Sequence, residues 1–216
     1  MKISVITPVY QPPASVLREC IESVLAQTHD EWEFCIVDDG SPADYVTPIL
    51  NEYANADDRI RLALRSINGG IVAASNEALK MATGEFVALL DHDDMLHRHA
   101  LERIVTAVAA APDVDYVYTD EDHLDSAGRH FGAFYKPDWS PERFRSQMFT
   151  CHLSTLRRSL VEEVGGFHEG YDGSQDYDLV LRVTERARKV ALLSFVWVEM
   201  TGVWSQKPLP VYVPGC

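Results

Sequence analysis

The chain has 216 residues, 46% of them hydrophobic and 24% charged, which is enough for one domain with a substantial core. Its formal net charge of −14 excludes nonspecific nucleic-acid binding, which needs a basic surface, and suits a protein that recruits divalent cations to a polyanionic ligand. The four cysteines show no CxxC spacing, and no apolar run approaches the roughly eighteen residues of a membrane span. We therefore expect a cytoplasmic protein, free or held at the inner face of a membrane by a larger assembly.

The first half of the chain alternates short β-rich runs with helical patterns. Strands separated by helices of this length imply right-handed crossovers, so we predict an α/β fold with a mainly parallel central sheet and helices on both faces. The predicted strands are residues 3–7, 32–40, 60–65, 85–90 and 114–120, and the predicted helices are residues 15–28, 43–55, 71–82 and 97–111.

The pattern changes after residue 120. The next stretch is rich in turn formers and aromatic residues, which predicts a hairpin and a long ordered loop. Two further helices are expected at residues 159–167 and 174–189. We interpret residues 1–120 and 121–190 as two halves of one domain, followed by an atypical apolar tail at 191–216.

The acidic run Asp91-His92-Asp93-Asp94 directly follows the predicted buried strand "EFVALL". Carboxylates this close repel one another, so a metal ion or basic side chains should lie beside them. The alternative is a solvated, acid-rich helix N-terminus. Asp38 and Asp39 also follow a strand, and ligands of open α/β sheets bind beyond the carboxyl ends of strands. This favours a site, and the carboxylates suit Mg²⁺ or Mn²⁺.

Two neighbouring motifs are less specific. In "VDDGS" (37–41), an aspartate either accepts from a base or ribose of a nucleotide or caps a strand-end turn. "RSINGG" supplies Arg65 and a glycine turn before a helix start that could hold a phosphate. The chain lacks both GxGxxG at this point and the P-loop lysine, which argues against a dinucleotide fold and a P-loop NTPase.

In the second half, Asp178 and Arg182 stand four residues apart on a predicted helix and should form an ion pair. Asp176 is either a helix cap residue or a general base that faces the cleft. Trp139 and Tyr135 belong either to the core under the loop or to a platform for stacking a sugar. The histidines at 97, 99, 123 and 130 follow no metal-ligand spacing.

Five segments in order resemble the family 2 glycosyltransferases of the GT-A fold: "ISVITPVYQ", "VDDGS", "NGGIVAASNEAL", "GEFVALLDHDD" and "GSQDYDLVLR". "YTDED" and "KPDWSPE" resemble the subgroup of bacterial surface polysaccharide synthesis, and the resemblance covers roughly residues 1–190. It implies an inverting transfer of a sugar from a UDP- or dTDP-sugar to a saccharide or lipid-linked acceptor, with Mn²⁺ or Mg²⁺ on the diphosphate.

The resemblance also assigns roles to residues. In the nucleotide pocket, the resemblance implies one acid that contacts the nucleobase, neighbours of that acid, and a second acid that contacts the ribose. Outside the nucleotide pocket, it implies a metal ligand in the DxD motif and a catalytic base. These are Asp39 on the base, with Thr7, Pro8 and Tyr10 beside it, Asp91 on the ribose, Asp93 on the metal with Asp94 nearby, and Asp176 as the base.

The sequence departs from the family pattern in two places. Gln175 stands where the family usually has a glutamate, and glutamine keeps the acceptor oxygen without the charge. Such sequences also commonly continue into a segment with a histidine that can complete the metal shell, whereas the last histidine here is His168. A domain that binds nucleotide-sugar with little or no turnover is therefore the alternative. A nucleotidyltransferase ranks last, because Thr7-Pro8-Val9-Tyr10 replaces its triphosphate loop.

Overall fold

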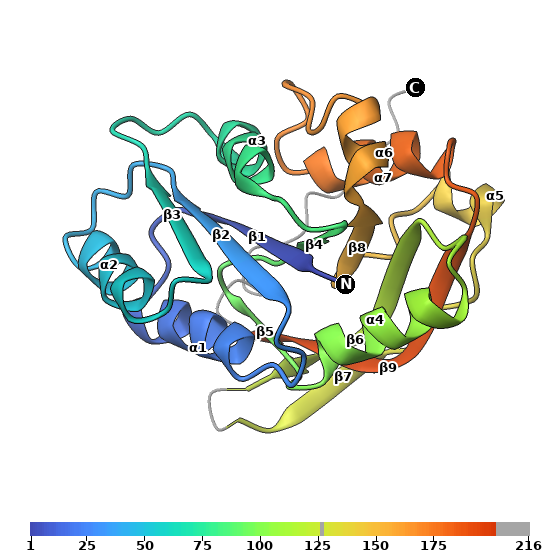
Figure 1. The fold of residues 1–216 in the computed structure, drawn as a ribbon, viewed down its shortest axis with the longest axis horizontal. Helices are drawn as coiled ribbons and strands as arrows, with labels where there is room; N and C mark the ends of the chain where they lie inside the picture. The colour runs from blue at the N-terminus through green and yellow to red at the C-terminus, as the bar shows by residue number, and fades with distance from the viewer. Residues whose placement is uncertain (126–127, 202–216) are drawn as a thin grey trace, which may run out of the picture.

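A nine-stranded sheet runs through the computed structural model, which describes residues 1–125 and 128–201 (Figure 1). The strand order is β3-β2-β1-β4-β8-β6-β9-β5, and β7 lies beside β6. The strands are β1 (Ile3–Val9), β2 (Trp32–Asp38), β3 (Ile60–Leu64), β4 (Phe86–Leu89), β5 (Asp94–Leu96), β6 (Tyr116–Leu124), β7 (His130–Phe134), β8 (Ser154–Arg157) and β9 (Val190–Thr201).

Helices cover both faces of this sheet, as the sequence predicts. Their buried residues belong to two apolar clusters, one on each face, with α1, α2 and α4 on one and α3, α6 and α7 on the other. The helices are α1 (Ala14–Leu25), α2 (Val46–Ala56), α3 (Ile71–Met81), α4 (Ala100–Ala110), the single turn α5 (Pro141–Phe144), α6 (Arg158–Glu163) and α7 (Gln175–Thr184).

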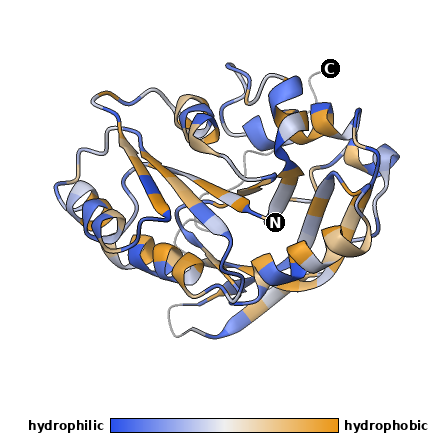
Figure 2. Ribbon diagram, viewed as in Figure 1, coloured by the Kyte–Doolittle hydropathy of each residue, from blue (hydrophilic) through white to orange (hydrophobic). Residues whose placement is uncertain are grey.

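The two clusters follow from the period of two along a strand. In β2, Phe34 and Ile36 pack into the cluster of α1, α2 and α4, whereas Cys35 and Val37 pack into the cluster of α3, α6 and α7. All of β2 is buried, which is typical of a strand covered by helices on both sides. Figure 2 shows the hydrophobic residues along the strands and on the helix sides that face them. Burying one such side chain contributes about 1.5–3 kcal/mol.

The expected parallel arrangement is confirmed for the first half of the sheet, where β1 pairs in parallel with both β2 and β4 and β2 with β3. The second half is mixed. β8 runs antiparallel to β4 and β6, and β7 forms the expected hairpin with β6. β9 is parallel to β6 and antiparallel to β5. The central sheet is therefore less uniformly parallel than the sequence predicts.

Some predicted boundaries are wrong. The helix predicted at 97–111 begins at Ala100, because residues Asp94–Leu96 form β5 against β9. The helix predicted at 174–189 ends at Thr184, since Arg188 turns back to donate its backbone N–H and guanidinium to Asp115. Residues 191–201, which the sequence analysis places in the apolar tail, belong to β9 within the sheet. The rest of that tail lies outside the described residues.

Candidate functional site

The acids singled out in the sequence meet at one edge of the sheet. Asp39 follows β2. The run Asp91 to Asp94 lies in the turn after β4, and Asp94 is the first residue of β5. Because β1 lies between β2 and β4 and runs parallel to both, the carboxyl ends of these three strands lie at the same edge. A cleft of about 510 Å³ opens there. Its lining includes Pro8, Tyr10, Asp39, Asp91 and Asp93.

Asp39 closes one side of this cleft by holding a loop. It is 3% exposed, and its two carboxylate oxygens accept the backbone N–H groups of Gly69 and Gly70 at 2.9 and 2.8 Å. Gly70 has φ +86°, and a Cβ on Gly69 would lie 2.3 Å from the Arg65 guanidinium. The backbone therefore favours glycine at position 70, whereas a side chain at position 69 would displace only the flexible end of Arg65. The loop leads directly into α3, whose N-terminus faces the cleft through Gly70 and Ile71.

Two of the predicted nucleotide-binding residues lie behind the cleft lining. The Arg65 Nε lies 2.8 Å from Asp39 Oδ1, and another guanidinium nitrogen donates to Glu77 at 2.8 Å. Thr7 is 1% exposed, and its hydroxyl donates to the Leu90 carbonyl at 2.8 Å. In this structure Arg65 supports Asp39, and Thr7 supports the turn that presents Asp91.

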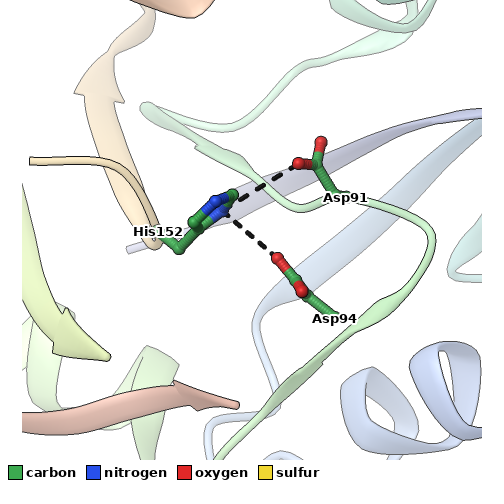
Figure 3. A group of neighbouring side chains, drawn as sticks. All are labelled: Asp91, Asp94 and His152. Carbon is green, nitrogen blue, oxygen red and sulfur yellow. Dashed lines mark ion pairs between the residues drawn. The ribbon is translucent and has the colours of Figure 1, made fainter. Parts of the chain in front are cut away.

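Beside the cleft, Asp91, Asp94 and His152 form a group whose side chains point toward one another (Figure 3). One ligand atom from each lies within 4.8 Å of the others. His152 Nδ1 lies 3.2 Å from Asp94 Oδ2 and 3.9 Å from Asp91 Oδ2. The Asp91 side chain is 51% exposed and that of Asp94 7%, so the group is open on one side and closed on the other.

The donor set of this group fits a divalent cation. Carboxylate oxygens and an imidazole nitrogen suit Mn²⁺ in particular, and Mg²⁺ through the carboxylates. Oδ2 of Asp94 is buried and accepts no hydrogen bond from the described residues, although it lies close to the His152 ring. A buried carboxylate oxygen without a hydrogen bond is costly unless a cation or another charge compensates it.

The charges of the group shift its pKa values. Burial raises the pKa of Asp94, and the neighbouring acids Asp91 and Asp93 add to the rise. Burial alone would lower the pKa of the His152 imidazole, but the carboxylates of Asp94 and Asp91 outweigh it and raise that pKa. Both groups therefore hold protons at a higher pH than they would in water, unless a cation replaces those protons.

Asp93 lies in the same cleft but outside this three-residue group. It is half-buried, and burial raises the pKa of its carboxyl. The structure thus brings Asp94, rather than Asp93, together with Asp91 and His152. Asp94 is the nearby acid that the sequence analysis places second to Asp93.

A smaller cavity of about 50 Å³ adjoins the group on its other side. Asp91 and His152 line it, and so do Cys151, Gln175 and Asp176. Asp176 accepts the backbone N–H of Tyr177 at 2.8 Å, and burial raises the pKa of its carboxyl. Gln175 accepts from the Gly173 N–H at 2.8 Å, which ties the start of α7 to the loop before it. Asp91 lines both cavities and therefore stands between the cleft and Asp176.

The remaining sequence predictions have plain structural outcomes. Asp178 and Arg182 form the expected ion pair, with nitrogen–oxygen distances of 2.5 and 3.0 Å. Trp139 is half-buried and packs against the core: its ring centre lies 5.0 Å from that of Phe144, within an aromatic cluster over β6. Tyr135 is 73% exposed. No helix among residues 1–125 and 128–201 is long and apolar enough to cross a membrane.

His152 was not predicted from the sequence. What brings it to the site is strand pairing: β8 runs antiparallel to β4, with Ser154 opposite Leu89, so the residues just before β8 lie next to those just after β4. Sequence patterns cannot reveal this pairing, because antiparallel neighbours far apart in the chain leave no local periodicity. Lys136 and Glu121, which are buried next to His152, were missed for the same reason.

The fold is similar to that of solved glycosyltransferase structures of the GT-A type. Over 93% of its length the chain superposes on S. aureus TarS 1-349 in complex with UDP-GlcNAc, with a TM-score of 0.78 and 23% identity, covering 58% of that chain. Over 92% it superposes on the mannosyltransferase PcManGT from Pyrobaculum calidifontis in complex with GDP-Man and Mn²⁺, with a TM-score of 0.70 and 21% identity, covering 56% of that chain.

The sequence matches the family described as glycosyl transferase family 2 over residues 4–165. It is also 40% identical, over 87% of its length, to the O-antigen biosynthesis protein RfbC of Myxococcus xanthus. The chain therefore belongs to glycosyl transferase family 2, as the resemblance implies. It spans only 15% of the length of RfbC.

Proposed function

We propose that this chain is the donor-binding and catalytic domain of a metal-dependent, inverting glycosyltransferase. Its donor is a UDP- or dTDP-sugar, and its acceptor is a saccharide or lipid-linked saccharide of a surface polysaccharide. The observation that carries the proposal is the place of Asp91, between a cleft large enough for a nucleotide and a small cavity that holds Asp176.

The cleft supplies the parts that a nucleotide diphosphate needs. Asp39 offers a carboxylate that the Gly69 and Gly70 N–H groups hold in place. The ring of Tyr10, which is 43% exposed, offers a stacking surface. Asp91 is exposed enough to accept from a ribose hydroxyl. Thr7 and Arg65 act from behind, by fixing Asp91 and Asp39. These assignments favour nucleotide binding in the cleft.

A divalent cation would be held by Asp91, Asp94 and His152, with Asp93 as the other carboxylate in reach of the same cleft. When bound, the cation supplies Lewis-acid stabilisation of the charge that develops on the departing diphosphate. Mn²⁺ in the PcManGT complex supports this use of the site by analogy. Asp94 has the least exposed side chain of the three residues that would hold the cation.

We assign Asp176 as the base. Asp176 lines the small cavity beside Asp91, and in the proposal the acceptor hydroxyl approaches from this side. As the acceptor oxygen forms its bond to the anomeric carbon, the bond from that carbon to the diphosphate breaks, the diphosphate leaves and Asp176 takes the hydroxyl proton. Attack from the face opposite the diphosphate in this single displacement gives inversion. Burial raises the pKa of Asp176 and makes the ionised carboxylate a stronger base.

The alternative, donor binding without turnover, rests on a missing metal-ligand histidine in the tail. His152 supplies an imidazole to the acidic group from a different part of the chain, which favours turnover.

Calorimetric titration with UDP and dTDP, each with and without Mn²⁺, tests the proposal on the wild type and on Asp93→Asn. We expect binding that Mn²⁺ strengthens and that the substitution weakens. No binding of either nucleotide would refute the proposal, and binding without hydrolysis or transfer to any acceptor would favour the alternative.

A further inference from the structure

Lys136 is a lysine without exposed side-chain surface. Its ammonium lies 2.7 Å from Glu121 Oε2 on β6. It also donates to the carbonyl oxygens of Cys151 and His152, the second at 2.5 Å. The three ammonium protons thus have three acceptors. The backbone N–H of Lys136 donates to Asp120 Oδ1 at 2.7 Å, so the residue is fixed to β6 at both ends.

The two carbonyls belong to the segment that delivers His152 to the acidic group. The imidazole of the same residue lies 3.2 Å from Asp94, and Cys151 lines the small cavity with Asp176. Thr119 on β6 makes two further bonds to this segment: its Oγ1 accepts the Leu153 N–H at 3.2 Å, and its hydroxyl donates to the His152 carbonyl at 3.5 Å. The main chain on either side of the His152 ring is therefore held by β6 and by Lys136.

A buried ion pair is weak evidence for a role in stability, because desolvation of the two charges offsets most of their attraction. An apolar pair of similar volume would fill the same space. What an apolar pair would lack is direction: a buried ammonium with three short contacts fixes where its carbonyl partners lie. Groups that orient a metal ligand typically change metal affinity 10–100-fold when removed.

We propose that Lys136 is a positioning residue, which fixes the main chain at Cys151 and His152 so that the His152 imidazole faces Asp91 and Asp94. The inference deepens the proposed function, since it makes the imidazole a preformed part of the cation site. Glu121 is the counter-charge that allows the ammonium to remain buried.

The test removes both charges together. Lys136→Met alone would leave Glu121 buried without its partner and could unfold the protein, so the informative variant is the double substitution Glu121→Gln/Lys136→Met. Arg157→Met is the matched control. Arg157 ends β8, the strand that follows His152, and it also binds two backbone carbonyls and a buried carboxylate, those of Pro112, Val114 and Asp115.

Two measurements test the role of Lys136 separately from the proposed function. The first is hydrogen exchange of the His152 and Leu153 amides in the metal-free protein. We expect exchange at least about tenfold faster in the double variant and unchanged exchange in Arg157→Met. The second is Mn²⁺ affinity in the presence of UDP, which should fall about 10–100-fold in the double variant and stay unchanged in the control.

Wild-type exchange and wild-type Mn²⁺ affinity in the folded double variant would overturn the inference and leave the proposed function intact. If the wild type binds no Mn²⁺, the proposed function fails as a metal-dependent reaction, and the exchange measurement still decides whether Lys136 positions His152. Equal effects of the double variant and Arg157→Met would assign Lys136 to general stability and would also overturn the inference.

Discussion

His152 Nδ1 lies 3.2 Å from Asp94 Oδ2, although the two residues come from different halves of the chain. Asp94 begins β5 after the β4 strand, and His152 precedes β8, the antiparallel neighbour of β4. The pairing of β4 with β8 therefore closes the acidic turn with an imidazole. This contact places an imidazole nitrogen beside a run of repelling carboxylates, so the group offers mixed donor atoms.

Asp94→Asn and His152→Ala should each weaken the Mn²⁺-dependent part of UDP binding by about tenfold or more, because each removes a proposed ligand. Binding of UDP without Mn²⁺ should change little, since Asp39 and its loop remain. Calorimetric titration with and without Mn²⁺ measures both. A loss in Asp93→Asn together with wild-type behaviour of both other variants would assign the cation to Asp93 instead.

Mn²⁺ affinity should rise with pH between about 6 and 8. The pKa values of Asp94 and His152 are both raised, so each group keeps its proton to a higher pH than usual, and a cation must displace it. Affinity therefore increases as the protons leave, by up to about tenfold per pH unit for each proton displaced. Titrations at three pH values test this. His152→Ala should show a shallower dependence, and a slope as steep as that of the wild type would contradict the assignment.

Asp176→Asn should lower the rate of sugar transfer by about 10²- to 10⁴-fold and leave UDP affinity unchanged, because the amide cannot accept the acceptor proton. In the wild type, the raised pKa of Asp176 predicts a rate that increases with pH until the carboxyl is ionised. Single-turnover transfer, with donor binding measured in parallel, provides the test. Asp178→Asn on the same helix is the control: it breaks the pair with Arg182 and should affect thermal stability, not the transfer step.

Far from the site, Glu33 should contribute to folding stability in a pH-dependent way. Burial would raise its pKa, but hydrogen bonds from Lys2, Ser4 and Thr83 outweigh that and hold the pKa at about 2, below the ordinary value of 4.5. A depressed folded-state pKa gives stability that is full above about pH 4.5 and is lost as the pH falls toward 2.

Glu33→Gln should therefore lower the free energy of unfolding by about 2 kcal/mol at pH 7, and the difference should shrink between pH 5 and pH 2. Urea denaturation across this range measures it. A difference that does not vary with pH would mean that packing, and not the ionised carboxylate, accounts for the loss.

Local patterns in the sequence determined the first half of the fold. The largely apolar run "WEFCIVD" follows from a strand covered on both faces, and the acids after β2 and β4 follow from strands that end at one edge of a parallel sheet. Both effects depend on the residue period within a strand and on the order of strands along the chain, which can be read from neighbouring residues. The same reasoning predicts that Asp39, Asp91 and Asp93 lie together, and all three line one cleft.

Only the tertiary structure decided which groups complete the site. The antiparallel insertion of β8 between β4 and β6 brings His152 to Asp94, and β6 with Lys136 fixes it there. It also packs Trp139 against the core and places Arg65 behind Asp39. Such contacts join residues distant in the chain, and their energy depends on burial and direction, which no local pattern of residue types encodes.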